Sequence, residues 1–273
     1  MTYKTILYVM NDDADNQRRV GLARELASRC GGSLVVLHVT QPVIIPIAFA
    51  EGTAYLPPEV IDAQQVAAAK VTERMKQIYR EVCEPETVPS RWRHEEGELG
   101  AMANLAARAA DLTVLGAMPT SGMDALAPTL VEQLALGAGG PVLVLPREGA
   151  ATVPGRRIVL AWNNSRESAR ALNDALGFLA AAENVTVAGL GSAKALYVDD
   201  VVARLGRHGV AAEAHVEAES GDAGTALLRI AADRGADMLV MGAYGRARLR
   251  ELILGGATRD VLRTATIPVL FSC

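Results

Sequence analysis

Four glycines near the carboxyl end of the chain have a spacing that could build an anion-binding loop. Gly242 and Gly245 follow the apolar run DMLVM. Gly255 and Gly256 come immediately before ATRDVLRTAT, which has a helical pattern. Glycine adopts positive φ and lets a ligand approach the backbone, and the start of a helix leaves N–H groups unpaired at the positive end of its dipole. Together these two sets of donors predict a nest for a phosphate chain.

Side chains close to these glycines could take part in the same chemistry. Thr258 is placed to serve as a cap or first-turn residue of the helix. A guanidinium fork suits phosphate oxygens, and arginine recurs here at the following positions: Arg246, Arg248, Arg250 and Arg259. The simpler interpretation of any single arginine is a solvated surface residue near Glu251. The spacing matches neither the Walker loop, because no Gly-Lys-Ser/Thr occurs, nor the dinucleotide fingerprint, because the Gly-x-Gly pair is missing.

The elements that would position this loop belong to a plan that the chain contains twice. KTILYVMN matches RRIVLAWN, and LAARAADLTVLGA matches IAADRGADMLVMGA. In each copy near-continuous Val, Leu and Ile runs alternate with amphipathic helical patterns, which is typical of parallel sheets covered on both faces. The small-residue stretch REGAATVPGR separates the copies. We predict two tandem five-stranded, parallel, doubly wound α/β domains of Rossmann-like type, at residues 1–148 and 155–273.

A ligand site is expected at the carboxyl ends of the strands, where the strand order reverses. In the second domain the predicted strands are 157–161, 184–190, 211–216, 238–241 and 269–272. The turn WNNS follows the first of these strands and the loop GAYG follows the fourth. These two places are polar or rich in glycine, so we expect the site between them.

This pattern resembles that of a known family. Gly242-x-x-Gly245, nine further residues, Gly255 and then a small residue are similar to the ATP-binding signature of the universal stress protein family, and the final strand IPVL and the turn after the first strand match as well. The resemblance covers both halves and implies a tandem of two universal stress domains. In that family the nucleotide lies over the first and fourth strands of a parallel sheet. The implied ligand is ATP or another adenine nucleotide, with or without Mg.

Carried over residue by residue, the resemblance implies that Ala161 and Asn163 line the adenosine. Met241 and Gly242 would hold the ribose and the α-phosphate side. The residues implied around the phosphates, with Arg246 close to them, are Gly245, Gly255, Gly256, Ala257 and Thr258.

Two positions depart from the family's pattern. Asn163 stands where the family's ATP binders usually carry Asp, and its amide offers an oxygen acceptor but no charge to hold ribose hydroxyls. Gly256 stands where Ser or Thr is usual, so a hydroxyl is lost while the backbone N–H remains, and Thr258 is placed to compensate. We expect binding that is weaker than in the family's strong binders, or altered.

The first half replaces the glycine loop with GAMPTSGMDALAPTL. Aligned on the flanking strands, Pro119 falls at the position of Gly245, and Pro128 falls at that of Gly255. Proline has no N–H and its φ is fixed, so two donors and the left-handed turns are lost. We predict that the first domain keeps the sheet but has a degenerate nucleotide site.

Other polar features have an ordinary explanation beside a functional one. The acidic run NDDADN after the first strand could bind a divalent ion, but a polar turn and an acidic helix start explain it without a metal. Trp162 could stack on a base, although packing at a strand end is the simpler interpretation. His38 ends a strand pattern and is expected to be partly buried. The apolar segment 41–60 could cover a cleft, form an interface or pack over the sheet edge.

Composition limits the partners. The net charge of −4 without a basic stretch argues against nucleic acid, and no apolar run reaches the ~18 residues of a membrane span. Scattered cysteines and an N-terminus without a signal-peptide pattern predict a cytoplasmic protein. The final strands PVLVLP and PVLFSC are apolar edges. In the resembling family such edges pair, here as a pseudo-dimer within one chain, and tandem chains can dimerise again.

Three functions stay open on this basis. The first is a nucleotide-binding module whose occupancy changes how the protein meets a partner during stress. An enzyme, such as a slow ATPase or a nucleotidyl-transfer protein, ranks second, because hydrolysis needs a positioned water and charge stabilisation and no base can be identified. A scaffold whose sites bind nothing ranks third.

Overall fold

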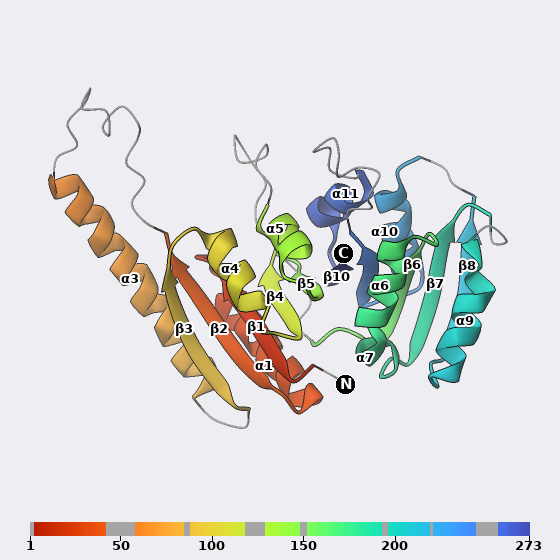
Figure 1. Ribbon diagram of the computed structural model, residues 1–273, viewed down its shortest axis with the longest axis horizontal. Helices are drawn as coiled ribbons and strands as arrows, with labels where there is room; N and C mark the ends of the chain where they lie inside the picture. Colours follow the sequence, from red (N-terminus) through yellow and green to blue (C-terminus); the bar gives the residue numbers. More distant parts are fainter. Residues whose placement is uncertain are drawn as a thin grey trace.

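The computed structural model places both halves of the chain on a single sheet flanked by helices (Figure 1). The residues that it describes are 3–41, 58–84, 88–117, 129–147, 152–192, 196–218, 221–243 and 256–273. The segment 41–60 therefore lies mostly outside the described residues, and Pro119 and Pro128 lie outside them as well.

Each half of the chain contributes five strands. The N-terminal half supplies β1 (Thr5–Met10), β2 (Ser33–Thr40), β3 (Ser90–Glu96), β4 (Leu112–Gly116) and β5 (Val142–Leu145). The C-terminal half supplies β6 (Arg157–Trp162), β7 (Asn184–Leu190), β8 (Ala212–Glu217), β9 (Met238–Gly242) and β10 (Val269–Ser272). The strands predicted for the second half agree with these to within one residue at each end. One correction concerns the site: Gly242 is the last residue of β9, not the first residue after it.

The strands form one ten-stranded sheet in the order β3-β2-β1-β4-β5-β10-β9-β6-β7-β8. Neighbours within each half are parallel, whereas β5 and β10 pair antiparallel. The order reverses between β1 and β4, and again between β6 and β9. The carboxyl ends of these two pairs are called here the N-terminal and the C-terminal switch point. The predicted doubly wound fold and the pairing of the two final strands within one chain are both confirmed.

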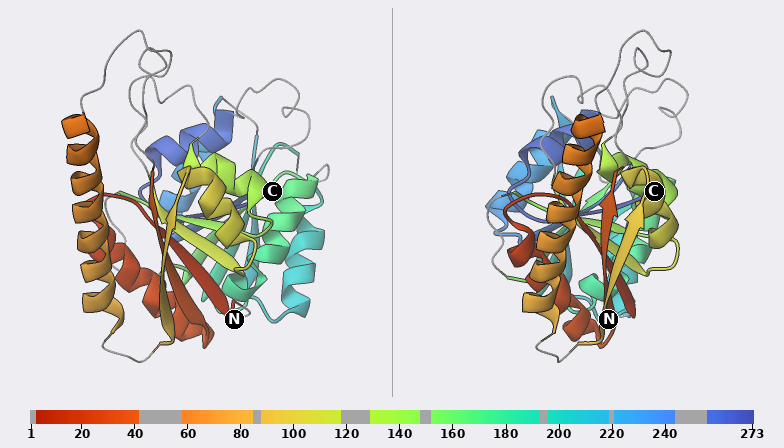
Figure 2. Two further views of the ribbon diagram at one scale, coloured as in Figure 1. Left: turned by 60° about the vertical axis from the view of Figure 1, so that its left-hand side comes forward. Right: turned by 90° about the vertical axis from the view of Figure 1, so that its left-hand side faces the viewer.

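Helices cover both faces of the sheet (Figure 2). One face carries α1 (Asn16–Cys30), α3 (Pro58–Cys83), α6 (Arg166–Asp174), α7 (Leu176–Leu179) and α9 (Val198–Arg207). The other carries α4 (Leu99–Ala107), α5 (Leu130–Gly137), α10 (Ala223–Asp233) and α11 (Gly256–Thr264). This double cover explains the near-continuous apolar runs of the strands. None of the described helices combines the length and apolar character that a bilayer crossing requires.

Helix α3 lies over β2 and β3 at the outer edge of the N-terminal half (Figure 1). His38 of β2 is only 5% exposed, which is deeper than the partial burial expected from the sequence. Its Nε2 lies 3.2 Å from Oγ1 of Thr72 on α3, and its ring stacks on that of His94 with centroids 5.7 Å apart. Its Nδ1 has no hydrogen-bond partner in the part of the chain that the structure describes. The charged ring, which has a proton on both nitrogens, would therefore be buried with one N–H donor unpaired.

Acid is expected to loosen this contact. Burial, together with the neighbouring His94, lowers the pKa of His38 from 6.5 to about 4, while Asp12 acts weakly in the opposite direction. The unfolded chain therefore takes up a proton that the folded protein refuses until about pH 4, so stability falls as the pH drops from 6.5 through this range. The melting temperature should fall less on acidification in His38→Gln than in the wild type. His208→Gln is the control, because His208 is exposed. If the melting temperature of His38→Gln falls on acidification as much as that of the wild type, His38 is not the group responsible.

Candidate functional site

The turn after β6 uses the side-chain oxygen of Asn163. Oδ1 of Asn163 accepts a hydrogen bond from Ser165 N at 3.2 Å, and Oγ of Ser165 caps α6 by accepting from Ser168 N at 3.1 Å. Asn164, between them, has a φ of 57°, a conformation that asparagine tolerates. Asn163 is exposed. Its oxygen keeps a second lone pair and its NH2 group is a donor, so the exposed amide can offer a ligand either an acceptor or a donor.

Gly242 lies against the first turn of α6. A methyl group on its Cα would stand 2.5 Å from the carbonyl carbon of Glu167 and 2.7 Å from the nitrogen of Ser168. These are backbone atoms that cannot rotate away, so a glycine is needed for α6 to approach the end of β9 this closely. From the sequence, Gly242 is attributed to the close approach of a ligand, whereas in the structure the packing of α6 already requires a glycine at this position.

Two neighbouring candidates have buried side chains. Ala161 is 8% exposed and Met241 is 5% exposed, and both side chains belong to the apolar core of the face that carries α10 and α11. Any contact that these residues make with a ligand would therefore come from their backbone atoms.

Helix α11 begins at Gly256 itself, with Ala257 and Thr258 in its first turn. Thr258 is buried, and its predicted first-turn position is confirmed. The turn packs against the start of α10, since a methyl group on Gly224 would stand 2.8 Å from the carbonyl oxygen of Ala257. The start of α10 is capped by Asp222, whose carboxylate accepts from Gly224 N at 3.2 Å. The first turn of α11 thus packs against the capped start of another helix.

The topology brings the described candidates to one end of the sheet. Because β6 and β9 are parallel neighbours, the ends that carry Ala161 and Met241 lie side by side. Helix α11 connects β9 to the parallel strand β10, so its first turn begins at the same carboxyl edge. The remaining predicted residues lie outside the described part of the chain: Gly245, Arg246 and Gly255, and with them Arg248 and Arg250.

The matching helix of the N-terminal half, α5, starts with an internal cap. Oγ1 of Thr129 accepts from Glu132 N at 3.3 Å, and Oε2 of Glu132 accepts from Thr129 N at 2.5 Å. Glu132 is 3% exposed, so a buried carboxylate occupies the helix start. Aligned on the strands that follow, its counterpart in α11 is Arg259, which is exposed. The two helix starts therefore differ in the charge that they carry.

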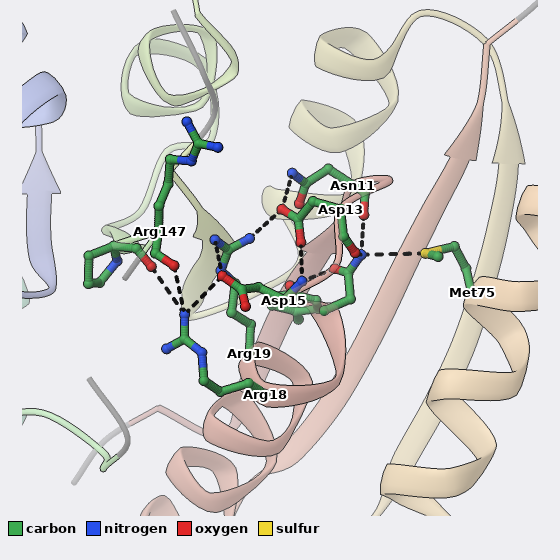
Figure 3. Close-up of polar contacts among 10 residues, drawn as sticks. Asn11, Asp13, Asp15, Arg18, Arg19, Met75 and Arg147 are labelled. Carbon is green, nitrogen blue, oxygen red and sulfur yellow. Dashed lines mark hydrogen bonds and ion pairs between the residues drawn. The ribbon is translucent and has the colours of Figure 1, made fainter. Parts of the chain in front are cut away.

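Trp162 and the acidic run, whose roles the sequence leaves open, both make contacts within the protein. Trp162 is 8% exposed, and its Nε1 donates to the carbonyl oxygen of Leu196 at 2.7 Å. Its interpretation as a strand-end packing residue is confirmed. In the acidic run, Asp13 and Asp15 both pair with Arg19 of α1 (Figure 3). Arg19 belongs to no motif, and sequence reasoning missed it; the signal was an arginine where the repeat has Ala171.

The family model of the universal stress proteins matches residues 2–146 and 188–272, which is most of the chain. The chain belongs to the universal stress protein family. The resemblance found in the glycine spacing and the final strands is thereby confirmed. The first matched region spans β1 to β5, and the second begins within β7 and runs to β10.

Solved universal stress proteins share this fold over the whole chain. One from Archaeoglobus fulgidus is 16% identical, with 100% of this chain and 96% of its own covered and a TM-score of 0.74. A putative one from Pseudomonas aeruginosa is also 16% identical, with 99% and 93% covered and a TM-score of 0.62. At these identities they show the fold alone. The universal stress protein Slr1230 of Synechocystis is 46% identical over 55 residues, 20% of this chain, so the match spans only 19% of that relative's length.

Proposed function

We propose that this universal stress protein binds ATP or another adenine nucleotide, with or without Mg, in its C-terminal half, and that occupancy regulates its contact with a partner under stress. The start of α11 carries the proposal. This helix begins at Gly256 without an acidic residue in its first turn, and first-turn N–H groups have no partner within a helix. Such donors, at the positive end of a helix dipole, suit phosphate oxygens.

Charge and hydrogen-bonding groups support the same half of the molecule. Arg259 adds a positive charge one turn into α11, whereas Glu132 adds a negative one at the start of α5. Across the C-terminal switch point, the exposed amide of Asn163 can donate a hydrogen bond to a ligand. A ligand rich in acceptor oxygens would match both sides of this site.

Family membership adds support for a nucleotide. One universal stress protein has been solved in complex with cAMP, so a member of this family binds a nucleotide. For the present chain, the identity of the nucleotide is part of the proposal. We also place the protein in the cytoplasm, because Cys30, Cys83 and Cys273 form no disulfide with one another, as is usual in a reducing compartment.

Gly255→Pro is expected to weaken nucleotide binding by at least about tenfold, because proline removes one N–H donor and fixes φ in the phosphate loop. The N-terminal half already carries Pro128 at this position. Pro128→Gly, the reverse exchange in the other half, is the matched control and should leave the affinity unchanged. Isothermal titration of each protein with ATP, AMP and cyclic AMP measures the effect.

Denaturing the purified wild-type protein should also release a copurified adenine nucleotide, which mass spectrometry would identify. If the wild type binds none of the three nucleotides, the proposed function is wrong. If Gly255→Pro binds as the wild type does, the phosphates lie elsewhere.

A further inference from the structure

Arg19 of α1 occupies the N-terminal switch point. Its side chain is 2% exposed and reaches the end of β4, where a methyl group on Gly116 would stand 2.5 Å from its Cζ. Its Nη1 pairs with Asp13, and its Nη2 lies 3.4 Å from Oδ2 of Asp15 (Figure 3). Both carboxylates belong to the turn after β1. The guanidinium therefore bridges the carboxyl ends of β1 and β4, between which ligands of doubly wound sheets bind.

As a device for stability this arrangement is a poor one. Nε of Arg19 is buried without a hydrogen-bond partner among the described residues, and such a donor keeps its desolvation penalty. Only the guanidinium of this ion pair is buried, because Asp13 and Asp15 are partly exposed, and a charge taken out of water in this way carries a large desolvation penalty. The position of this charge calls for another explanation.

The C-terminal half shows the same position without the arginine. Aligned on the matching first strands, Arg19 corresponds to Ala171, which is fully buried. There the backbone of α6 itself lies against Gly242, whereas in the N-terminal half the guanidinium stands between α1 and Gly116. The arginine side chain thus takes up the space beside the end of β4.

We propose that the N-terminal switch point is a self-occupied site, in which the Arg19 guanidinium, held by Asp13 and Asp15, stands where a ligand would bind and so restricts ligand binding to the C-terminal half. That Arg19 fills the N-terminal switch point is inferred from the contacts of these side chains alone. The restriction to one half rests on the proposed nucleotide function. The internal cap formed by Thr129 and Glu132 closes the other source of donors in the same half.

Arg18 provides a matched control beside Arg19. It pairs with the same Asp15, at 3.3 Å, but its side chain is 28% exposed. Its Nη2 donates to the carbonyl oxygens of Pro146 at 3.4 Å and Arg147 at 3.3 Å, which follow the end of β5. Arg18→Ala therefore removes an equal charge and a shared partner without emptying the switch point.

Arg19→Ala is expected to lower the melting temperature by about 5 °C and to leave a polar hollow beside Asp13 and Asp15. Millimolar guanidinium chloride should then restore at least half of the loss, compared with sodium chloride at equal concentration, because the free ion replaces the missing group. Neither the wild type nor Arg18→Ala should gain. Absence of rescue in Arg19→Ala, or equal rescue of both variants, overturns the self-occupied site.

Arg19→Lys serves if the alanine variant does not fold. It keeps the charge and fills the space, so guanidinium should not stabilise it, and stabilisation would overturn the proposal. Titration of the wild-type protein with ATP tests the restriction and should give one nucleotide per chain. Two per chain would overturn the restriction and support the proposed function. None would overturn the proposed function, and guanidinium rescue would still decide whether the site is self-occupied.

Discussion

Alanine in place of Gly242 is expected to lower the free energy of unfolding by about 2–3 kcal/mol and to weaken nucleotide binding. The new methyl group would meet backbone atoms of Glu167 and Ser168 at 2.5 and 2.7 Å. A helix backbone cannot rotate away as a side chain can, so α6 must shift as a unit. Because the cap of α6 is tied to Asn163, the shift also moves a proposed ligand contact. Urea unfolding measures the first effect and titration calorimetry the second.

Gly116→Ala is the matched control, since Gly116 ends β4 as Gly242 ends β9. Its methyl group would meet the guanidinium of Arg19, the end of a flexible side chain. That group can give way by a small shift of the side chain, so we expect a smaller loss of about 1 kcal/mol and unchanged nucleotide binding. Equal losses in the two variants would show that the contact with α6 does not constrain Gly242.

The strands and the start of α11 can be predicted from the sequence because their signals are local. Each strand of the C-terminal half is bounded by turn residues, and β7 and β10 begin and end where the pattern predicts. Gly256 and the amphipathic segment after it locate the helix start to within a residue. The doubly wound order then follows from the alternation of strands and helices, because parallel crossovers have one hand.

Arg19 shows why the rest could not be predicted. It is one of two adjacent arginines in α1, and nothing local tells which is buried, yet Arg18 is 28% exposed and Arg19 only 2%. The difference is set by Gly116, which lies far along the chain and leaves room for a guanidinium. Gly242 is a second example. Its type agrees with the approach of a ligand, but the structure shows that the packing of α6, which is distant in the sequence, requires a glycine there. Comparison of the two copies gave the available hint, because Ala171 occupies a core position of α6.

The joint between the two halves depends on a residue that precedes β1. Tyr3 is 4% exposed, its ring lies 5.3 Å from that of Phe178 on α7, and its hydroxyl donates to the carbonyl oxygen of Asp174 at the end of α6. Burial raises the pKa of Tyr3, as expected for a hydroxyl closed off from water. The pairing of β5 with β10 is short. Side-chain contacts such as this one therefore carry much of the connection.

Tyr3→Ala is expected to lower the free energy of unfolding by about 3–4 kcal/mol and to split thermal unfolding into two calorimetric transitions, because the halves then lose part of their shared apolar contact. Tyr3→Phe, the matched control, keeps the ring against Phe178 and loses only one hydrogen bond, so it should lose about 1 kcal/mol and keep a single transition. If Tyr3→Ala behaves as Tyr3→Phe does, the ring contact contributes little. The antiparallel pairing of β5 and β10 would then be enough to make the two halves unfold together.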